Sequence, residues 1–207
     1  MELILIRHGL PVRTELSEGI ADPGLSDAGR AQARLLADYL AAESIDAVYA
    51  SPMRRAYQTA EALAGPRGLD ITVVDEVAEW DRNASEYIPI EELKAANDPR
   101  WHAAAAGQWE HFEEEPAVFR ARVVEAVEAI IEAHSGDVVA ISCHGGVINA
   151  YISHILDLPV SHGFFYPNYT SIHRVAASRR GHRSVVTLNE TSHLRGSGLP
   201  MGLVQQS

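Results

Sequence analysis

The chain has 207 residues, of which 46% are hydrophobic and 22% are charged, and its formal net charge is −11 at pH 7. This length and composition fit one globular domain with a sizeable core, and no apolar run is long enough to span a bilayer. The excess of acidic residues argues against a surface that binds nucleic acid or an anionic membrane, because both require a positive field.

The cysteine content and the first residues of the chain indicate in which cellular compartment the protein is expected. The one cysteine, Cys143, excludes an internal disulfide framework and fits a reducing environment. The opening residues MELILIRHG carry an acid before a short apolar run and lack the basic leader of a secretory signal. We therefore expect a cytoplasmic protein.

The first predicted elements are a strand, a helix and a second strand. Residues 2–6 form a continuous aliphatic run, typical of a buried strand, and a glycine-containing loop follows. Ser26 is the expected N-cap of a helix that extends to about residue 42 with apolar residues at helical spacing. Residues 46–51 predict the second strand.

In the middle of the chain the secondary-structure pattern is at first regular and then becomes irregular. Ser51 and Pro52 predict the N-cap and the first residue of a second helix, and residues 71–77 predict a third strand. From residue 79 to residue 115 the pattern holds only short helical pieces, near 89–96, together with three tryptophans and many acidic residues.

The last third of the chain again alternates helix and strand. Pro116 begins a long amphipathic helix, residues 137–143 predict a fourth strand, and a further helix follows that strand to about Leu156. Two more strands are predicted at 171–178 and 183–189, with a glycine-containing turn between them.

Strands that alternate with helices predict an α/β fold whose sheet is largely parallel and covered on both faces. In such sheets ligands bind beyond the carboxyl ends of the strands. Residues 195–207 are rich in Gly, Ser and Gln and predict a loose C-terminal tail.

Four stretches that carry chemistry each follow a predicted strand: RHG, SPMRRAYQTA, AEWDR and SCHGG. A neutral imidazole is a nucleophile near pH 7, and fixed arginines stabilise the charge of a transferring phosphoryl group. A carboxylic acid can protonate the leaving oxygen. Each stretch alone also fits a polar turn or a solvated surface. Their shared place in the topology favours phosphoryl transfer without a metal ion or cofactor.

Six stretches together resemble the histidine phosphatase superfamily, in its phosphoglycerate-mutase-like branch, over residues 2 to about 194: LILIRHG, DPGLSDAGRAQA, VYASPMRRAYQTA, AEWDR, VVAISCHGGVIN and LNETSHL. The resemblance implies a three-layer α/β/α sandwich with a mostly parallel central sheet and a single domain over residues 1–194. It also implies a metal-independent phosphomonoester hydrolase that forms a phosphohistidine intermediate.

The resemblance assigns a role to seven residues of this chain. It implies five catalytic residues, namely His8 as the nucleophile, Arg7, Arg55 and His144 around the phosphate, and Glu79 as the proton donor. It further implies that Thr14 and the amide of Gly145 bind the substrate phosphate.

Some positions leave alternatives open. Glu76 and Asp81 compete with Glu79 for the acid role, because the match after the third strand is loose. Pro11 and Thr14 stand where many relatives have a threonine and an asparagine that assist the phosphate. Asn149 stands where an arginine is frequent, so the motif does not define the substrate. Arg54, next to the clamp arginine, is expected at the surface.

Other functions use the same residues less well. A thiol phosphatase would need an arginine six residues after Cys143, where the chain has Asn149, and the ten histidines lack the tight spacing of a metal site. A phosphomutase of the phosphoglycerate mutase type is one alternative, although this short chain has no obvious long insertion to enclose the substrate. A non-catalytic phosphate-binding or scaffold protein is the second alternative, although such a protein would be expected to lack His8, Arg55 or the acid, and all three are present.

Residues 79–115 are expected to cover the substrate. From Asp75 to Glu115 there are twelve Asp and Glu against three Arg and Lys, a local charge of −9, which repels highly charged substrates. We therefore expect a small or partly apolar phosphorylated substrate, with Trp80, Tyr87 and Trp101 as walls, and neither a nucleic acid nor a membrane as partner.

Overall fold

The computed structural model describes residues 1–105, 114–159 and 163–203, and a six-stranded sheet forms its centre. The strands are β1 (Glu2–Arg7), β3 (Ala47–Ala50), β4 (Ile71–Val73), β6 (Val138–Cys143), β7 (Ile172–Ala177) and β8 (Arg183–Glu190). Their order is β4-β3-β6-β1-β7-β8. The first four of these are parallel, and β7 and β8 add an antiparallel hairpin. The expected α/β class with a mostly parallel sheet is thus confirmed.

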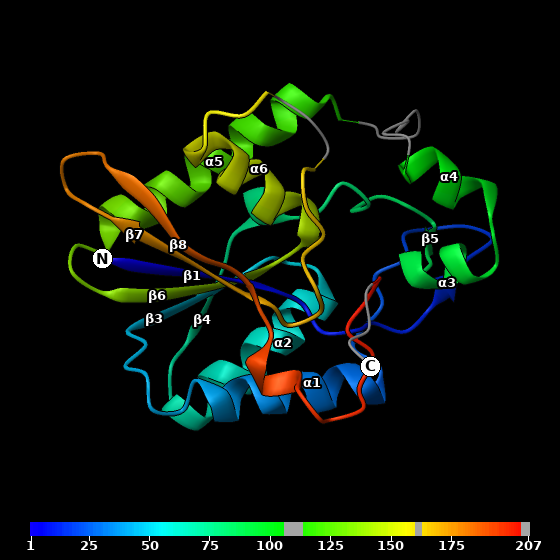
Figure 1. The fold of residues 1–207 in the computed structure, drawn as a ribbon, viewed down its shortest axis with the longest axis horizontal. Helices are drawn as coiled ribbons and strands as arrows, with labels where there is room; N and C mark the ends of the chain where they lie inside the picture. Colours follow the sequence, from blue (N-terminus) through cyan, green and yellow to red (C-terminus); the bar gives the residue numbers. More distant parts are fainter. Residues whose placement is uncertain (106–113, 160–162, 204–207) are drawn as a thin grey trace.

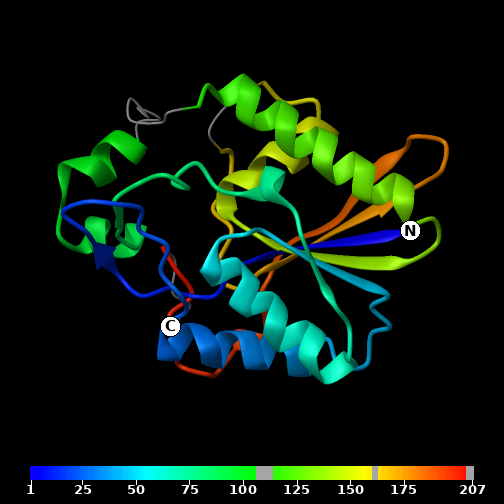
Figure 2. The ribbon, with the colours of Figure 1, turned by 180° about the vertical axis from the view of Figure 1, so that it is seen from behind.

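Helices cover both faces of the sheet, which makes the expected three layers. The helices α1 (Asp27–Tyr39) and α2 (Arg54–Ala64) lie on one face, and α5 (Pro116–Ala133) and α6 (Gly145–Ile155) lie on the other (Figures 1 and 2). Within the part of the chain that the structure describes, each helix is too short or too polar to cross a bilayer.

The central strand β1 shows why the sequence has a continuous aliphatic run here. Leu3 and Leu5 belong to the core cluster that includes side chains of α5 and α6. Ile4 and Ile6 point to the opposite face and pack with side chains of α1 and α2. Because alternate residues of a strand face opposite sides, a strand buried on both faces is apolar at every position.

Smaller elements gather beyond the carboxyl ends of the parallel strands. These are α3 (Ile90–Ala95), α4 (Pro99–Ala105) and a short ladder between β2 (Thr14–Glu15) and β5 (Glu86–Tyr87) (Figures 1 and 2). The segment expected to cover the substrate, 79–115, contributes most of them. Its residues 106–113 lie outside the described residues. The short helix near 89–96 is confirmed, whereas α4 and the ladder were not predicted.

The predicted start of α2 is wrong. The helix begins at Arg54 after Met53, and Ser51 does not cap it. Instead the Ser51 hydroxyl accepts a hydrogen bond from the Met53 amide at 3.3 Å and lies 2.7 Å from His144 Nε2. The serine is therefore engaged with a histidine from another loop.

Two further predictions differ from the structure in extent. The strand expected over 71–77 ends at Val73, and Asp75–Val77 form a single 3₁₀ turn, η2. In the segment expected as a loose tail, the carbonyl of Pro200 accepts a hydrogen bond from Gln32, and that of Met201 accepts one from the Tyr169 amide. Residues 204–207 of that segment lie outside the described residues.

Candidate active site

Four cationic or imidazole side chains meet at the carboxyl ends of three neighbouring strands. Arg7 ends β1 and His8 follows it, Arg55 lies in the first turn of α2 after β3, and His144 connects β6 to α6. All four are at most 8% exposed, and the rings of His8 and His144 are 5.1 Å apart. The structure thus brings together the residues that the sequence predicts around a phosphate.

The hydrogen bonds of His8 define its tautomer. His8 Nδ1 lies 2.8 Å from the carbonyl oxygen of Gly9, which can only accept, so Nδ1 carries the proton. The other ring nitrogen, Nε2, then has a free lone pair. Burial, together with the charges of Arg55 and Arg7, lowers the pKa of His8 well below its ordinary value. The ring is therefore neutral and nucleophilic at neutral pH.

Arg7 is fixed by a carbonyl and by two aromatic rings. Its guanidinium donates to the carbonyl oxygen of Pro167 at 2.6 Å. Its Cζ atom lies 4.3 Å from the ring centroid of Tyr169 and 5.0 Å from that of Tyr166. Cation–π contacts of this kind stabilise a buried guanidinium and limit its rotation.

Arg55 is held in a similar way by the segment that follows β4. Its Nη2 donates to Asp81 Oδ1 at 2.6 Å, and its Cζ lies 4.7 Å from the ring centroid of Tyr87. The hydroxyl of Thr59, one turn further along α2, accepts from the Gly9 amide at 3.0 Å and donates to the Arg55 carbonyl at 2.8 Å. Thr59 thereby joins the loop after β1 to α2.

Several buried nitrogen atoms around the two imidazoles have no partner within the described residues. They are the guanidinium donors Arg7 Nε, Arg55 Nε and Arg55 Nη1, together with His144 Nδ1. A Cβ atom added to Gly145, the first residue of α6, would lie 3.9 Å from Arg7 Nε, so the N-terminus of α6 adjoins the same cluster. Buried N–H donors are normally satisfied, and several of them around one point suit an anion with several oxygens.

Glu79 has the properties of a general acid. Its carboxylate accepts from the Gly146 amide at 2.8 Å and from the Trp80 amide at 3.2 Å. Burial, and next to it the charge of Asp81, raises the pKa of Glu79 to about 7. A Cβ atom at position 146 would lie 2.3 Å from Glu79 Oε1 and from Trp80 Nε1, so a side chain there would displace the Glu79 carboxylate. At neutral pH this group can both give and accept a proton.

The two alternative acids occupy other places. Asp81 forms the ion pair with Arg55, and Glu76 is exposed on the 3₁₀ turn η2. Thr14, expected to bind the substrate, pairs with Tyr87 in the β2–β5 ladder, and its hydroxyl donates to the Val12 carbonyl at 3.4 Å. Arg54 is exposed, as expected.

The aromatic residues expected as walls lie in three different surroundings. Tyr87 contacts the cluster, with its ring centroid 6.5 Å from that of His8. Trp80 instead stacks on Phe119 at 3.6 Å and packs against the core. Trp101 lies on α4, 5.5 Å from the Lys94 ammonium.

Sequence reasoning missed the supporting residues Ser51, Thr59, Tyr166 and Tyr169. Thr59 follows Arg55 by four residues in SPMRRAYQTA, a spacing that places both on one helix face. Asn149, found where an arginine is frequent, accepts from the Phe164 amide at 2.8 Å and donates to the Phe165 carbonyl at 3.1 Å. It therefore fixes the loop that leads to Tyr166.

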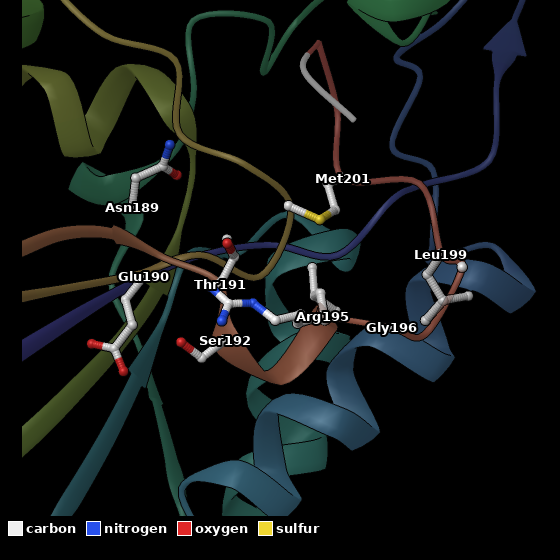
Figure 3. A pocket seen from close by; sticks show the side chains of 10 residues that line it. Asn189, Glu190, Thr191, Ser192, Arg195, Gly196, Leu199 and Met201 are labelled. Atoms are coloured by element: carbon white, nitrogen blue, oxygen red, sulfur yellow. The ribbon is translucent and has the colours of Figure 1, made fainter. Parts of the chain in front are cut away.

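A separate cavity of about 980 Å³ lies between the end of β8 and the C-terminal segment (Figure 3). Its lining residues are Asn189, Glu190, Thr191, Ser192, Leu194, Arg195, Gly196, Gly198, Leu199 and Met201. This lining includes none of the predicted site residues. Among the residues that the structure describes, no group of three or more His, Cys, Asp or Glu side chains is arranged to hold a metal ion.

Comparison with known proteins agrees with this geometry. The model of the histidine phosphatase superfamily (branch 1) matches residues 3–191. Phosphoserine phosphatase 1 of Hydrogenobacter thermophilus is 27% identical over 94% of each chain, and an acid phosphatase of Mycobacterium tuberculosis is 29% identical over 92% of this chain and 93% of its own. The solved structure of Bacillus stearothermophilus YhfR has a TM-score of 0.74 at 27% identity and covers 94% of this chain and 99% of its own. The chain is thus a phosphatase that belongs to branch 1 of the histidine phosphatase superfamily.

Proposed function

We propose that this phosphatase hydrolyses small phosphomonoesters by transferring the phosphoryl group first to His8 Nε2 and then to water, without a metal ion. One observation carries the proposal. Buried, unpartnered N–H donors of Arg7 and Arg55, together with the unpartnered Nδ1 of His144, surround the neutral imidazole of His8. Such donors stabilise the negative charge that the phosphoryl oxygens carry in the transition state.

In the first half of the reaction, His8 Nε2 attacks phosphorus and the bond from phosphorus to the ester oxygen breaks. The leaving oxygen takes the proton of the Glu79 carboxylic acid, so the alcohol departs neutral. The raised pKa of Glu79, about 7, keeps a useful fraction of this acid protonated at neutral pH. Phosphohistidine and ionised Glu79 are left.

In the second half, a water molecule takes the place of the alcohol. Glu79, now a carboxylate, accepts a proton from the water as its oxygen attacks phosphorus, and the bond from phosphorus to His8 Nε2 breaks. Inorganic phosphate leaves, and both residues return to their starting states. Arg7 and Arg55 hold the same phosphoryl oxygens throughout.

The test compares His8→Ala with the wild type on 4-nitrophenyl phosphate, with a chelator present. We expect the substitution to lower kcat/KM by about a thousandfold or more, because the nucleophile is lost. Acid-labile phosphate should be found on His8 after rapid quenching. His182→Ala, which alters an exposed histidine at the tip of the β7–β8 hairpin, is the matched control and should turn over normally. Loss of wild-type turnover in chelator, or turnover by His8→Ala, would reject the mechanism.

The proposal also covers the substrate, the domain, the phosphate-binding residues and the location of the protein. The substrate is a small phosphorylated molecule, and the name of the Hydrogenobacter thermophilus relative makes phosphoserine the first natural monoester to assay. Residues 1–194 act as one domain, Thr14 and the Gly145 amide assist in binding phosphate, and no cofactor, nucleic acid or membrane takes part. The single cysteine supports a cytoplasmic location.

A further inference from the structure

A carboxylate and two phenols lie next to the phosphate cluster and have no role in the mechanism above. Tyr166 and Tyr169 contact the Arg7 guanidinium, as their rings lie 5.0 and 4.3 Å from its Cζ atom. Glu91, from the first turn of α3, lies close enough to both phenols to raise their pKa electrostatically, although burial is the larger cause. These three residues form one group, which we name the Glu91 cluster.

Three oxygen atoms of the Glu91 cluster are buried and short of hydrogen-bond partners. Glu91 Oε2 and the Tyr169 hydroxyl have no partner within the described residues, and the Tyr166 hydroxyl has none there apart from the Arg7 guanidinium. Tyr169 as a whole is 0% exposed. A carboxylate has acceptors only, and burying one without a donor costs several times the free energy of a neutral hydrogen bond. The cluster is therefore built to accept hydrogen bonds from a donor that is not part of it.

The Glu91 cluster is continuous with the phosphate cluster. Tyr87 lies against His8 and Arg55, and it also interacts electrostatically with Tyr166 and Tyr169. Glu91 follows Tyr87 by four residues, across the short connection from β5 to α3. These elements lie beyond the carboxyl ends of the parallel strands (Figures 1 and 2). A small monoester bound to the arginines can therefore extend its organic part towards Glu91.

We propose that Glu91, with the hydroxyls of Tyr166 and Tyr169, binds a cationic amine on the organic part of the phosphomonoester. The proposal rests on the proposed function, because the amine is placed only when the phosphate occupies the arginines. An ammonium group has three donors for these acceptors and pairs with the carboxylate charge. The negative charge of the bound phosphate offsets repulsion between that ammonium and Arg7.

Other leaving groups meet the cluster less well. A second phosphate, or a carboxylate with no ammonium group beside it, would be repelled by Glu91 and by the local charge of −9 over residues 75–115. An alkyl group would leave Glu91 Oε2 buried and without a donor. The same geometry that accepts an amine thus discriminates against both.

The test compares two esters of similar size, O-phosphoethanolamine and n-propyl phosphate, in which a methyl group replaces the ammonium. We expect wild-type kcat/KM to favour the amine by about tenfold or more, as one charge-assisted hydrogen bond provides. Glu91→Gln should reduce this ratio to about twofold or less, and Tyr169→Phe should reduce it by a smaller factor. The ratio is insensitive to a general loss of folded enzyme.

Glu92→Gln is the matched control. Glu92 is the next residue on α3, but its carboxylate is exposed and pairs with Arg13 at 3.1 Å. We expect this variant to keep the wild-type ratio. Equal kcat/KM for the two esters in the wild type, or an unchanged ratio in Glu91→Gln, would overturn the amine subsite. If His8-dependent turnover of 4-nitrophenyl phosphate continues in that case, the proposed function stands; if it is absent in the wild type, both fail.

Discussion

Asp81 touches two parts of the candidate site at once. It accepts the 2.6 Å hydrogen bond from Arg55 and leaves two guanidinium nitrogens of that arginine, Nε and Nη1, unpartnered. Its charge is also the second cause, after burial, of the raised pKa of Glu79. Asp81 thus orients the arginine and helps to keep the acid protonated.

Replacing Asp81 by asparagine should move the pH dependence of catalysis. Without the negative charge the pKa of Glu79 falls, so fewer molecules hold the protonated acid at pH 7.5. For an alkyl phosphate, whose leaving group needs that proton, we expect the basic limb of the kcat profile to move to lower pH, with kcat at pH 7.5 reduced roughly threefold or more. Profiles of kcat from pH 5 to pH 9 measure this shift.

A substrate and a variant provide the controls for Asp81→Asn. The profile for 4-nitrophenyl phosphate should move much less, because its leaving group needs little protonation. Glu76→Gln removes an exposed carboxylate from the same segment and should leave both profiles unchanged. An alkyl phosphate profile identical in Asp81→Asn and wild type would show that Asp81 does not influence the acid.

At the scale of elements, the first turn of α1 packs directly on the loop that carries His8. The carbonyl oxygen of Leu10 accepts hydrogen bonds from the amide and the hydroxyl of Ser26, both at 2.9 Å. A Cβ atom on Gly29 would lie 2.1 Å from that oxygen, and one on Gly9 would lie 2.7 Å from the Gly29 carbonyl oxygen. Two glycines therefore allow the helix and the catalytic loop to touch.

Gly29→Ala should disturb both stability and catalysis. The added methyl group collides with backbone that Ser26 holds in place, so we expect a loss of about 2 kcal/mol or more in the free energy of unfolding. The loop after His8 must also shift, which lowers kcat/KM for 4-nitrophenyl phosphate. Gly65→Ala is the control, since Gly65 has a φ of −53° and nothing within 4 Å of its Cβ position. Equal stability of Gly29→Ala and wild type would contradict the close contact.

The same elements show how far the sequence predicts the structure. The stretches RHG and SCHGG locate the candidate residues His8 and His144 at strand ends, because each follows a short apolar run typical of a buried strand. The strand order, in which β1 lies between β6 and β7, has no periodic pattern in the sequence, because tertiary packing determines it. The partners of Arg7 also cannot be predicted from the sequence, since Tyr166 and Pro167 lie about 160 residues away in an irregular loop. Contacts of that range depend on the whole fold.

At the scale of the whole molecule, burial of histidines predicts how stability depends on pH. Burial lowers the pKa of His8, His144, His173 and His193, to about 3 for His173 and about 4 for His193. In the unfolded chain a histidine gains a proton near pH 6.5, whereas these four stay neutral in the fold. Their contribution to stability is complete above that pH and is lost as the pH falls. Glu79 acts in the opposite sense, because its raised pKa lets the folded state hold one extra proton between about pH 4.5 and about pH 7.

Between pH 6 and pH 5, unfolding lets the four histidines bind about four protons and makes Glu79 release about one. The net uptake on unfolding is therefore about three protons. The free energy of unfolding, measured with urea at pH 7, 6 and 5, should therefore fall by about 4 kcal/mol per pH unit in the acidic range. His173→Gln removes a buried histidine outside the phosphate cluster. It should reduce the slope by the contribution of about one proton. His182→Gln, at an exposed position, should leave it unchanged. A free energy of unfolding that is constant from pH 7 to pH 5 would mean that folding changes no net proton binding in this range, and would contradict the lowered pKa of these histidines.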